Sequence, residues 1–86
     1  MIDTRELMLG NKLYYDNGAM VRVIDVEVIT IDAVNGQWRD KFNPIELDNN
    51  WLAQLGVNPI RRRWYKRKFK YVHRLQNHFT NKFINQ

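Results

Sequence analysis

Apolar and polar residues alternate over short runs in the first half of the chain, and turn signals separate these runs. The clearest turn signal is Asp16-Asn17-Gly18, because Asn and Gly accept positive φ at little cost, and Asn35-Gly36 is a second. The runs between them are rich in β-branched and aromatic residues, which is typical of strands with one buried face. The pattern predicts a small four-stranded antiparallel β-meander or partial barrel, with strands over Leu13–Tyr15, Met20–Asp25, Val26–Ile31 and Gln37–Phe42.

Helical spacing replaces this alternation in the second half. Asp48 can cap a short helix over Asn49–Leu55, and Gly56 suits the left-handed position that follows a helix. From Tyr71 onward, apolar residues recur at spacings of three and four, which predicts a C-terminal amphipathic helix. The buried residues would be Trp51, Leu52 and Leu55 in the first helix and Val72, Leu75, Phe79 and Phe83 in the second. The predicted fold class is α+β, a single domain with a β part over 1–43 and an α part over 44–86.

Residues 60–70 fit two structures. If the C-terminal helix extends backward, Tyr65 and Phe69 join its buried face. The opposite face would then carry Arg63, Arg67, Lys70 and Arg74. The run Lys68-Phe69-Lys70-Tyr71 also alternates with period two, which indicates a hairpin with a basic tip at Lys66, Arg67 and Lys68. Both structures remain open at this point.

Charge is distributed very unevenly along the chain, whose net charge is +5. Residues 1–60 carry five basic and nine acidic side chains, a balance of −4, whereas residues 61–86 carry nine basic and no acidic ones, a balance of +9. Such a field steers polyanions toward one end of a molecule. The absence of Cys, of a signal-peptide pattern and of any run near the roughly 18 apolar residues of a membrane span leads us to expect a cytoplasmic protein.

The segment over residues 61–74 is the candidate binding site for an anionic partner. Its cations could neutralise phosphates, and Trp64 is the best candidate to stack on an unpaired base. The candidate site residues are Arg61, Arg62, Arg63, Trp64, Lys66, Arg67, Lys68, Lys70 and Arg74. One alternative is a face that only solubilises the protein, although ordinary surfaces intersperse the two signs of charge. A membrane-surface helix is another alternative, but a small domain needs the same apolar stripe for its core.

We find no catalytic signature, and we expect no metal and no cofactor. His73 and His78 are five positions apart, about 140° around a helix, so they do not form a ligand pair, and no Cys is available. We expect His73 to be a half-buried hydrogen-bonding residue and His78 to lie at the surface. Asp25 and Glu27 share strand parity and are expected on the solvent face of the sheet. Trp38 is expected in the core, with an extension of the binding surface through Trp38 and Arg39 as the alternative. The chain contains no Ser, no Gly-rich phosphate loop and no nucleophile elbow.

Three segments resemble a family of small, largely uncharacterised proteins found in Bacteroidetes genomes, often in prophages and mobile elements. They are RELMLGN at 5–11, PIELDNNWLAQLGV at 44–57 and KYVHRLQNHF at 70–79. Members of that family carry an EL-x-x-GN start, a PI-x-L and WL-x-x-G middle and a YVH-x-LQN helix near the end. The resemblance implies no particular activity. This chain is short between Gly56 and Tyr71, where the basic segment lies.

These observations predict a non-enzymatic, phage-type binding protein, monomeric or dimeric. The leading hypothesis is an inhibitor of a host nucleic-acid-guided defence nuclease, of the anti-CRISPR kind, that engages RNA or an RNA-binding channel. It would act in the cytosol of the host if a phage encodes it. The alternatives are a general RNA- or DNA-binding accessory protein and a structural interaction module. RNA or a nucleoprotein is the expected partner, DNA is possible, and no membrane partner is expected.

Overall fold

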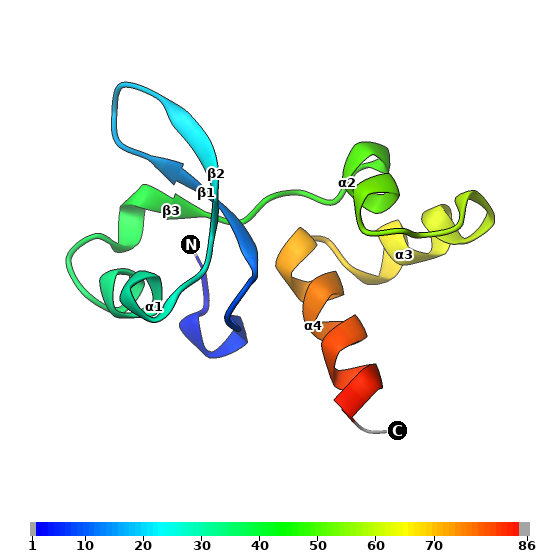
Figure 1. Cartoon of the computed structure of the whole chain (residues 1–86). Helices are drawn as coiled ribbons and strands as arrows, with labels where there is room; N and C mark the ends of the chain where they lie inside the picture. The colour runs from blue at the N-terminus through cyan, green and yellow to red at the C-terminus, as the bar shows by residue number, and fades with distance from the viewer. Residues whose placement is uncertain (1, 85–86) are drawn as a thin grey trace.

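A three-stranded antiparallel sheet organises the N-terminal half of the computed structural model, which describes residues 2–84 and their side chains through residue 81. The strands are β1 (Lys12–Asp16), β2 (Val21–Asp25) and β3 (Phe42–Asn43), in the order β2-β1-β3 (Figure 1). The α+β class is confirmed. The four-stranded meander is wrong, because β1 is the central strand and residues 2–84 form only three strands.

The turn between β1 and β2 is confirmed. The Asn17 side chain accepts hydrogen bonds from the backbone N–H groups of Ala19 and Met20, each at 2.9 Å. Gly18 has a φ of 93°, which a residue with a Cβ rarely adopts. The register that follows pairs Leu13 with Ile24, so that one face of the sheet points into the core.

The predicted strand over Val26–Ile31 is wrong. The helix α1 (Val28–Asn35) replaces it, and Glu27 precedes this helix as its N-cap. The backbone N–H of Glu27 donates to the Thr30 hydroxyl at 3.1 Å, as part of a reciprocal capping box. Helical winding buries Thr30 and Val34, which are four positions apart, while Val28 and Ile29 stay exposed. Glu27 therefore does not share a strand with Asp25.

The predicted strand over Gln37–Phe42 is also wrong, apart from its last residue. Asn35-Gly36 ends α1 instead of joining two strands, and a single 3₁₀ turn, η2 (Arg39–Lys41), leads into β3. Trp38 is 46% exposed and is not a core residue. The Lys41 ammonium lies 5.3 Å from the centre of its ring, a cation–π contact at the surface.

The helices at either end of the α part are confirmed. Asp48 caps α2 (Asn49–Gln54) by accepting a hydrogen bond from the Trp51 N–H at 2.8 Å, and Gly56 follows with a φ of 79°. The C-terminal helix is α4 (Val72–Ile84). Leu52, Val72 and Leu75 are buried, whereas Trp51, Leu55 and Phe79 are half-buried. The predicted burial of Phe83 lies outside the described side chains.

The basic segment is helical, so the predicted hairpin is wrong. Its elements are a 3₁₀ turn, η3 (Pro59–Arg61), and α3 (Arg62–Lys68), and α3 does not continue into α4. Phe69 is extended, with φ −121° and ψ 119°. The Lys70 carbonyl accepts a hydrogen bond from the Leu47 N–H at 3.0 Å, and the Val72 N–H donates to the Ile45 carbonyl at 2.9 Å. The link that follows β3 thus pairs with the backbone between α3 and α4, and this short β-like contact separates the two helices.

The core consists of two clusters, one in each half of the chain. The N-terminal cluster is Ile2, Leu7, Leu13, Val26, Val34 and Phe42, and the C-terminal cluster is Ile45, Leu47, Leu52, Val57, Tyr65, Val72 and Leu75. Tyr14, on the second face of β1, packs against the C-terminal cluster. In Figure 1 the sheet and α1 lie on one side, while α2, α3 and α4 gather on the other.

A set of polar contacts between the N-terminal turn and α4 joins the two halves, and we call it the polar joint. The turn begins with η1 (Thr4–Glu6) and runs to β1. Asn77 contributes most: its amide oxygen accepts from the Asn11 side chain at 2.8 Å, and its amide nitrogen donates to the Glu6 carbonyl. The Gln76 side chain accepts from the Lys12 backbone N–H at 2.9 Å. Because Asn11 is buried, water cannot readily replace a hydrogen bond that its side chain loses.

Asn77→Ala should therefore destabilise the fold far more than an ordinary surface change. The substitution leaves the buried Asn11 amide and the Glu6 carbonyl without these partners, which should lower the free energy of unfolding by about 2 to 4 kcal/mol. Urea denaturation followed by circular dichroism measures this loss. Thr80→Ala, an exposed position of the same helix, is the matched control and should change the value by less than about 0.5 kcal/mol. Equal losses in the two variants would contradict the role of the joint.

Candidate nucleic-acid interface

One aromatic side chain anchors α3 and fixes which residues face outward. Tyr65 is buried in the C-terminal cluster, where its ring lies 5.7 Å from that of Phe79 and 6.3 Å from that of Phe69. At the start of this segment, the Asn58 side chain accepts from the Ile60 N–H at 3.0 Å, and Pro59 opens η3. With Tyr65 pointing inward, the helical period directs Arg63 and Arg67 away from the core.

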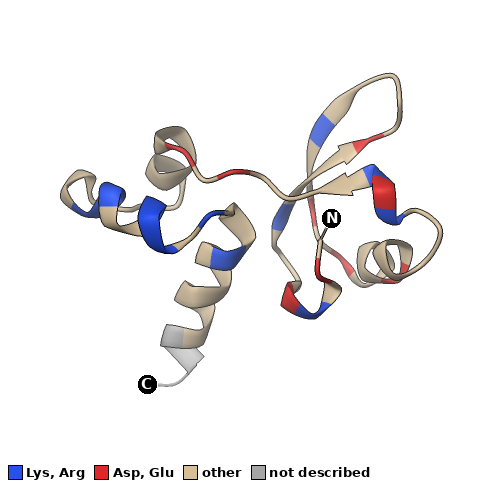
Figure 2. Cartoon of the chain, turned by 180° about the vertical axis from the view of Figure 1, so that it is seen from behind, with Lys and Arg blue, Asp and Glu red and all other residues tan. Residues whose placement is uncertain are grey.

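Six of the predicted site residues form an exposed cationic surface, which we call the basic face. All six are exposed, and none forms an ion pair with another residue in the described part of the chain. They are Arg61, Arg63, Lys66, Arg67, Lys68 and Lys70. Figure 2 shows basic residues without acidic neighbours along α3 and at the start of α4, whereas the N-terminal half carries both signs of charge and the link before α2 is acidic.

Arg62 and Arg74, although predicted as site residues, have partners within the protein. Arg62 is half-buried, and its Nε donates to the Val57 carbonyl at 3.3 Å. Arg74 lies 3.2 Å from the Glu6 carboxylate and contributes to the polar joint. The predicted continuous stripe through Arg63, Arg67, Lys70 and Arg74 is wrong, because residues 69–71 separate the two helices.

Folding alone does not account for the basic face. Arg63 and Arg67 are neighbours on the helix surface, and like charges at this spacing destabilise a helix slightly. Arg61 and Arg63 lie at the N-terminal end of α3, where the helix dipole disfavours cations. Only the cations in its last turn, Lys66 to Lys68, match the dipole. The anchoring through Tyr65 would tolerate acidic residues at the outward positions equally well.

Trp64 lies beside the basic face and is 52% exposed, as expected of a side chain available for stacking. Its ring meets the Tyr65 ring edge-on at 4.8 Å, and the Lys68 ammonium lies 4.9 Å from its centre. Arg61 and Trp64 line a shallow depression next to these contacts. The arrangement presents a large aromatic surface among cations, which is how proteins bind single-stranded nucleic acid.

The two histidines lie in different environments. His73 is buried rather than half-buried, and its Nε2 lies 3.2 Å from the Glu6 carboxylate, whereas Nδ1 meets no hydrogen-bond partner among the side chains and backbone that the structure describes. His78 is half-buried against Phe69, with the two ring centres 4.9 Å apart, and so is not a plain surface residue. Across residues 2–84, His, Asp and Glu side chains nowhere gather in the groups of three that a metal site needs.

Burial and the polar joint shift two pKa values. Burial lowers the pKa of His73 below its usual 6.5, and the Glu6 carboxylate only partly opposes this effect. Burial alone would raise the pKa of Glu6, but its hydrogen bonds with His73 and Arg74 outweigh that effect and hold the pKa below the usual 4.5. The buried ring is therefore neutral and donates from Nε2, since protonation would add an N–H at Nδ1 that has no acceptor. The local sequence pattern gave no sign of this pairing.

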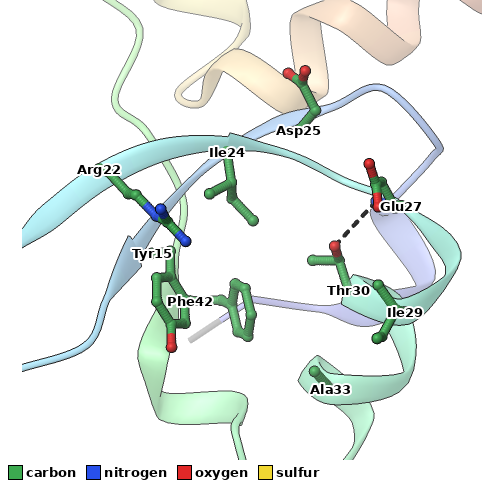
Figure 3. A pocket seen from close by; sticks show the side chains of 9 residues that line it. All are labelled: Tyr15, Arg22, Ile24, Asp25, Glu27, Ile29, Thr30, Ala33 and Phe42. Carbon is green, nitrogen blue, oxygen red and sulfur yellow. Dashed lines mark hydrogen bonds between the residues drawn. The ribbon is translucent and has the colours of Figure 1, made fainter.

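A cleft of about 560 Å³ lies in the N-terminal half, between β2 and α1 (Figure 3). Tyr15, Ile24 and Phe42 supply its apolar surface. Of its polar groups, Glu27 and Thr30 cap α1, and the Arg22 guanidinium lies 5.5 Å from the centre of the Tyr15 ring. These polar residues thus contribute to local structure, and they do not form a nucleophile and base pair.

The chain matches no protein-family model, no curated protein and no solved structure. Function must therefore be inferred from its own side chains. Several residues that carry the resemblance noted above, including Glu6, Asn11, His73, Gln76 and Asn77, meet at the polar joint. Those residues hold the fold together and do not belong to the basic face. The helices within residues 2–84 are too short or too polar to cross a membrane.

Stability should fall on mild acidification because of His73. Since the pKa of His73 is lower in the folded protein, the unfolded chain binds more protons as the pH falls below about 6.5. The free energy of unfolding should thus decrease between pH 7 and pH 5.5, and protonation of Glu6 should decrease it further below about pH 4.5. Urea denaturation across this range measures the effect.

His73→Gln removes this titration and retains a side-chain amide that can donate toward Glu6. Its stability should change less between pH 7 and pH 5.5 than that of the unaltered protein, whatever its absolute value. Thr80→Ala, which leaves every titratable side chain in place, is the matched control and should keep the original pH dependence. If His73→Gln kept that dependence as well, the neutral buried state of His73 would be refuted.

Proposed function

We propose that this protein is a non-enzymatic RNA-binding protein that engages its partner through the basic face. The observation that supports this proposal is the set of six exposed cations without ion-pair partners among the described residues, displayed on a helix that Tyr65 fixes in place. Each cation can neutralise a phosphate and release its counterion. The basic face supplies positive charge, and Trp64 beside it supplies an aromatic ring for stacking, so the two together suit binding.

Unpaired RNA fits this surface better than duplex DNA. With seven residues, α3 spans about 10 Å, which is short for a recognition helix in the DNA major groove. Proteins read RNA mainly through unpaired bases that stack on aromatic rings and Arg planes. Trp64 provides such a ring among the cations of the basic face. DNA also offers phosphates, and a comparison of the two polymers is part of the test below.

More specifically, we propose which RNA the protein binds, and we call this the sharper form of the proposal. The resemblance to proteins of phages and mobile elements favours the guide RNA, or the channel that holds it, in a host defence nuclease. A small basic protein can inhibit such a nuclease by binding alone, without any catalytic residue. It would act in the host cytosol. The apolar face of α4 cannot lie in a membrane instead, because Val72 and Leu75 are buried in the core.

Binding to RNA should depend steeply on salt and on the basic face. If about six phosphates are neutralised, the affinity for a single-stranded RNA should fall roughly 300-fold between 50 and 200 mM salt. Reversing Arg63→Glu and Arg67→Glu together should weaken binding and flatten the salt dependence, because two phosphate contacts are lost and repulsion is added. Fluorescence anisotropy with labelled RNA and DNA strands measures both quantities.

The matched control carries Arg39→Glu and Lys41→Glu, which change the net charge equally but lie in the N-terminal half. This control should keep most of the affinity, and circular dichroism should show that both variants are folded. Equal losses of affinity in the two variants would show that only the net charge matters, and would reject the basic face as the binding site. An affinity that does not respond to salt would also reject it.

The sharper form predicts inhibition of an RNA-guided nuclease from the host. Adding the protein in molar excess to the purified nuclease with its guide should lower target cleavage, and more protein should lower it further. The Arg63→Glu, Arg67→Glu variant should inhibit much less, whereas the Arg39→Glu, Lys41→Glu control should inhibit normally. Undiminished cleavage at saturating protein would exclude that nuclease as the target.

A further inference from the structure

A second cationic feature lies next to the basic face, in an open groove of about 560 Å³. The floor of the groove is one side of α4, formed by Arg74, Asn77, His78 and Asn81 at helical spacing. One wall is the end of α3, at Lys68 and Phe69, and the other is the N-terminal turn at Arg5 and Met8. The groove therefore forms only because the polar joint places the N-terminal turn beside α4.

The groove combines two tilted aromatic rings with cations and a polar amide. The rings of Phe69 and His78 are both half-buried and lie 4.9 Å apart, so each keeps an accessible part. Lys68 and Arg74 are exposed, and Asn81 is exposed on the same side of α4. Asn77 contributes no free amide, because both ends of its amide are used in the polar joint.

The single acidic residue of the groove is already neutralised. The Glu6 carboxylate lies 3.2 Å from His73 Nε2 and 3.2 Å from the Arg74 guanidinium. An Arg side chain has five N–H donors, so Arg74 retains donors for a second anion. Lys68 has no acidic partner among the described residues. A phosphate would therefore be held at the Lys68 side of the groove, away from Glu6.

Lys68 connects the groove with the basic face. Its ammonium lies 4.9 Å from the centre of the Trp64 ring and 5.9 Å from that of Phe69. A polymer that lies along α3 and stacks on Trp64 would thus reach Phe69 by passing a cation that borders both rings. Two aromatic surfaces along one cationic path suit a strand whose bases are unpaired.

We propose that this groove holds one unpaired nucleotide of a single-stranded RNA. The base lies against Phe69 and His78, the Asn81 amide hydrogen-bonds an edge of the base, and Lys68 and Arg74 hold its phosphate. The inference rests on the proposed function and adds that the protein selects single strands over duplexes. A duplex offers its phosphates to the basic face, but its bases are stacked inside the helix and cannot enter the groove.

The test compares a labelled 15-nucleotide RNA without self-complementarity with the duplex that it forms with its complement, at 50 mM salt. The single strand should bind more tightly. His78→Ala should weaken single-strand binding by about fivefold or more, since a stacking surface is lost, and should leave duplex binding unchanged. Asn81→Ala, at an exposed position that should not disturb folding, should weaken single-strand binding in the same selective way. Thr80→Ala is the control on α4 and should change neither affinity.

Crosslinking supplies a readout independent of affinity. A 4-thiouridine in the single strand should crosslink to a peptide within residues 68–81, and the His78→Ala variant should reduce that product. If strand and duplex bound equally well, and His78→Ala and Asn81→Ala left the affinities unchanged, the proposal for the groove would be overturned. In that case a loss of binding with Arg63→Glu, Arg67→Glu would still support the proposed function. If the unaltered protein bound neither RNA, the proposed function would fail and the groove with it.

Discussion

The amide of Asn77 is the contact on which the rest of this structure depends most directly. It bonds both Asn11 and the Glu6 carbonyl, so one side chain of α4 holds both ends of the N-terminal turn. Neither half of the molecule has a large core, since the sheet has only three strands and β3 is two residues long. The polar joint, together with Tyr14 packing on the C-terminal cluster, combines two small cores into one fold.

Unlike the polar joint and the two core clusters, the basic face does not stabilise the fold. Tyr65 and Phe69 attach the segment to the core, and the neighbouring cations contribute repulsion. Arg62 and Arg74 show the contrast, because each has a definite partner and contributes to structure. Arg62 therefore belongs to the fold and the six cations without partners to the proposed interface, whereas Arg74 belongs to both, because it also lines the groove.

Local chemistry made part of this structure predictable. Asn17-Gly18 indicated the first turn, Asp48 and Gly56 bounded α2, and Val72 with Leu75 indicated α4, because each signal acts within a few residues. The prediction of a strand over Val26–Ile31 was wrong because the β-branched residues of this segment suit a strand. The capping box that starts α1 was not recognised, because Glu27 and Thr30 occupy it in the reverse of the usual order. The pairing of Glu6 with His73, 67 positions apart, and the groove beside it depend on tertiary packing that no local pattern reports.

The polar joint and the groove share Glu6 and Arg74, and this overlap relates stability to the proposed binding. Because the Arg74 guanidinium pairs with the Glu6 carboxylate and the neutral His73 ring donates a hydrogen bond to it, the N-terminal turn can form a wall of the groove without repelling a phosphate. The Tyr65 anchor and the strand-like link at Lys70 bring the cations of α3 beside this groove. Selectivity for single strands would then come from the groove, and affinity from the basic face.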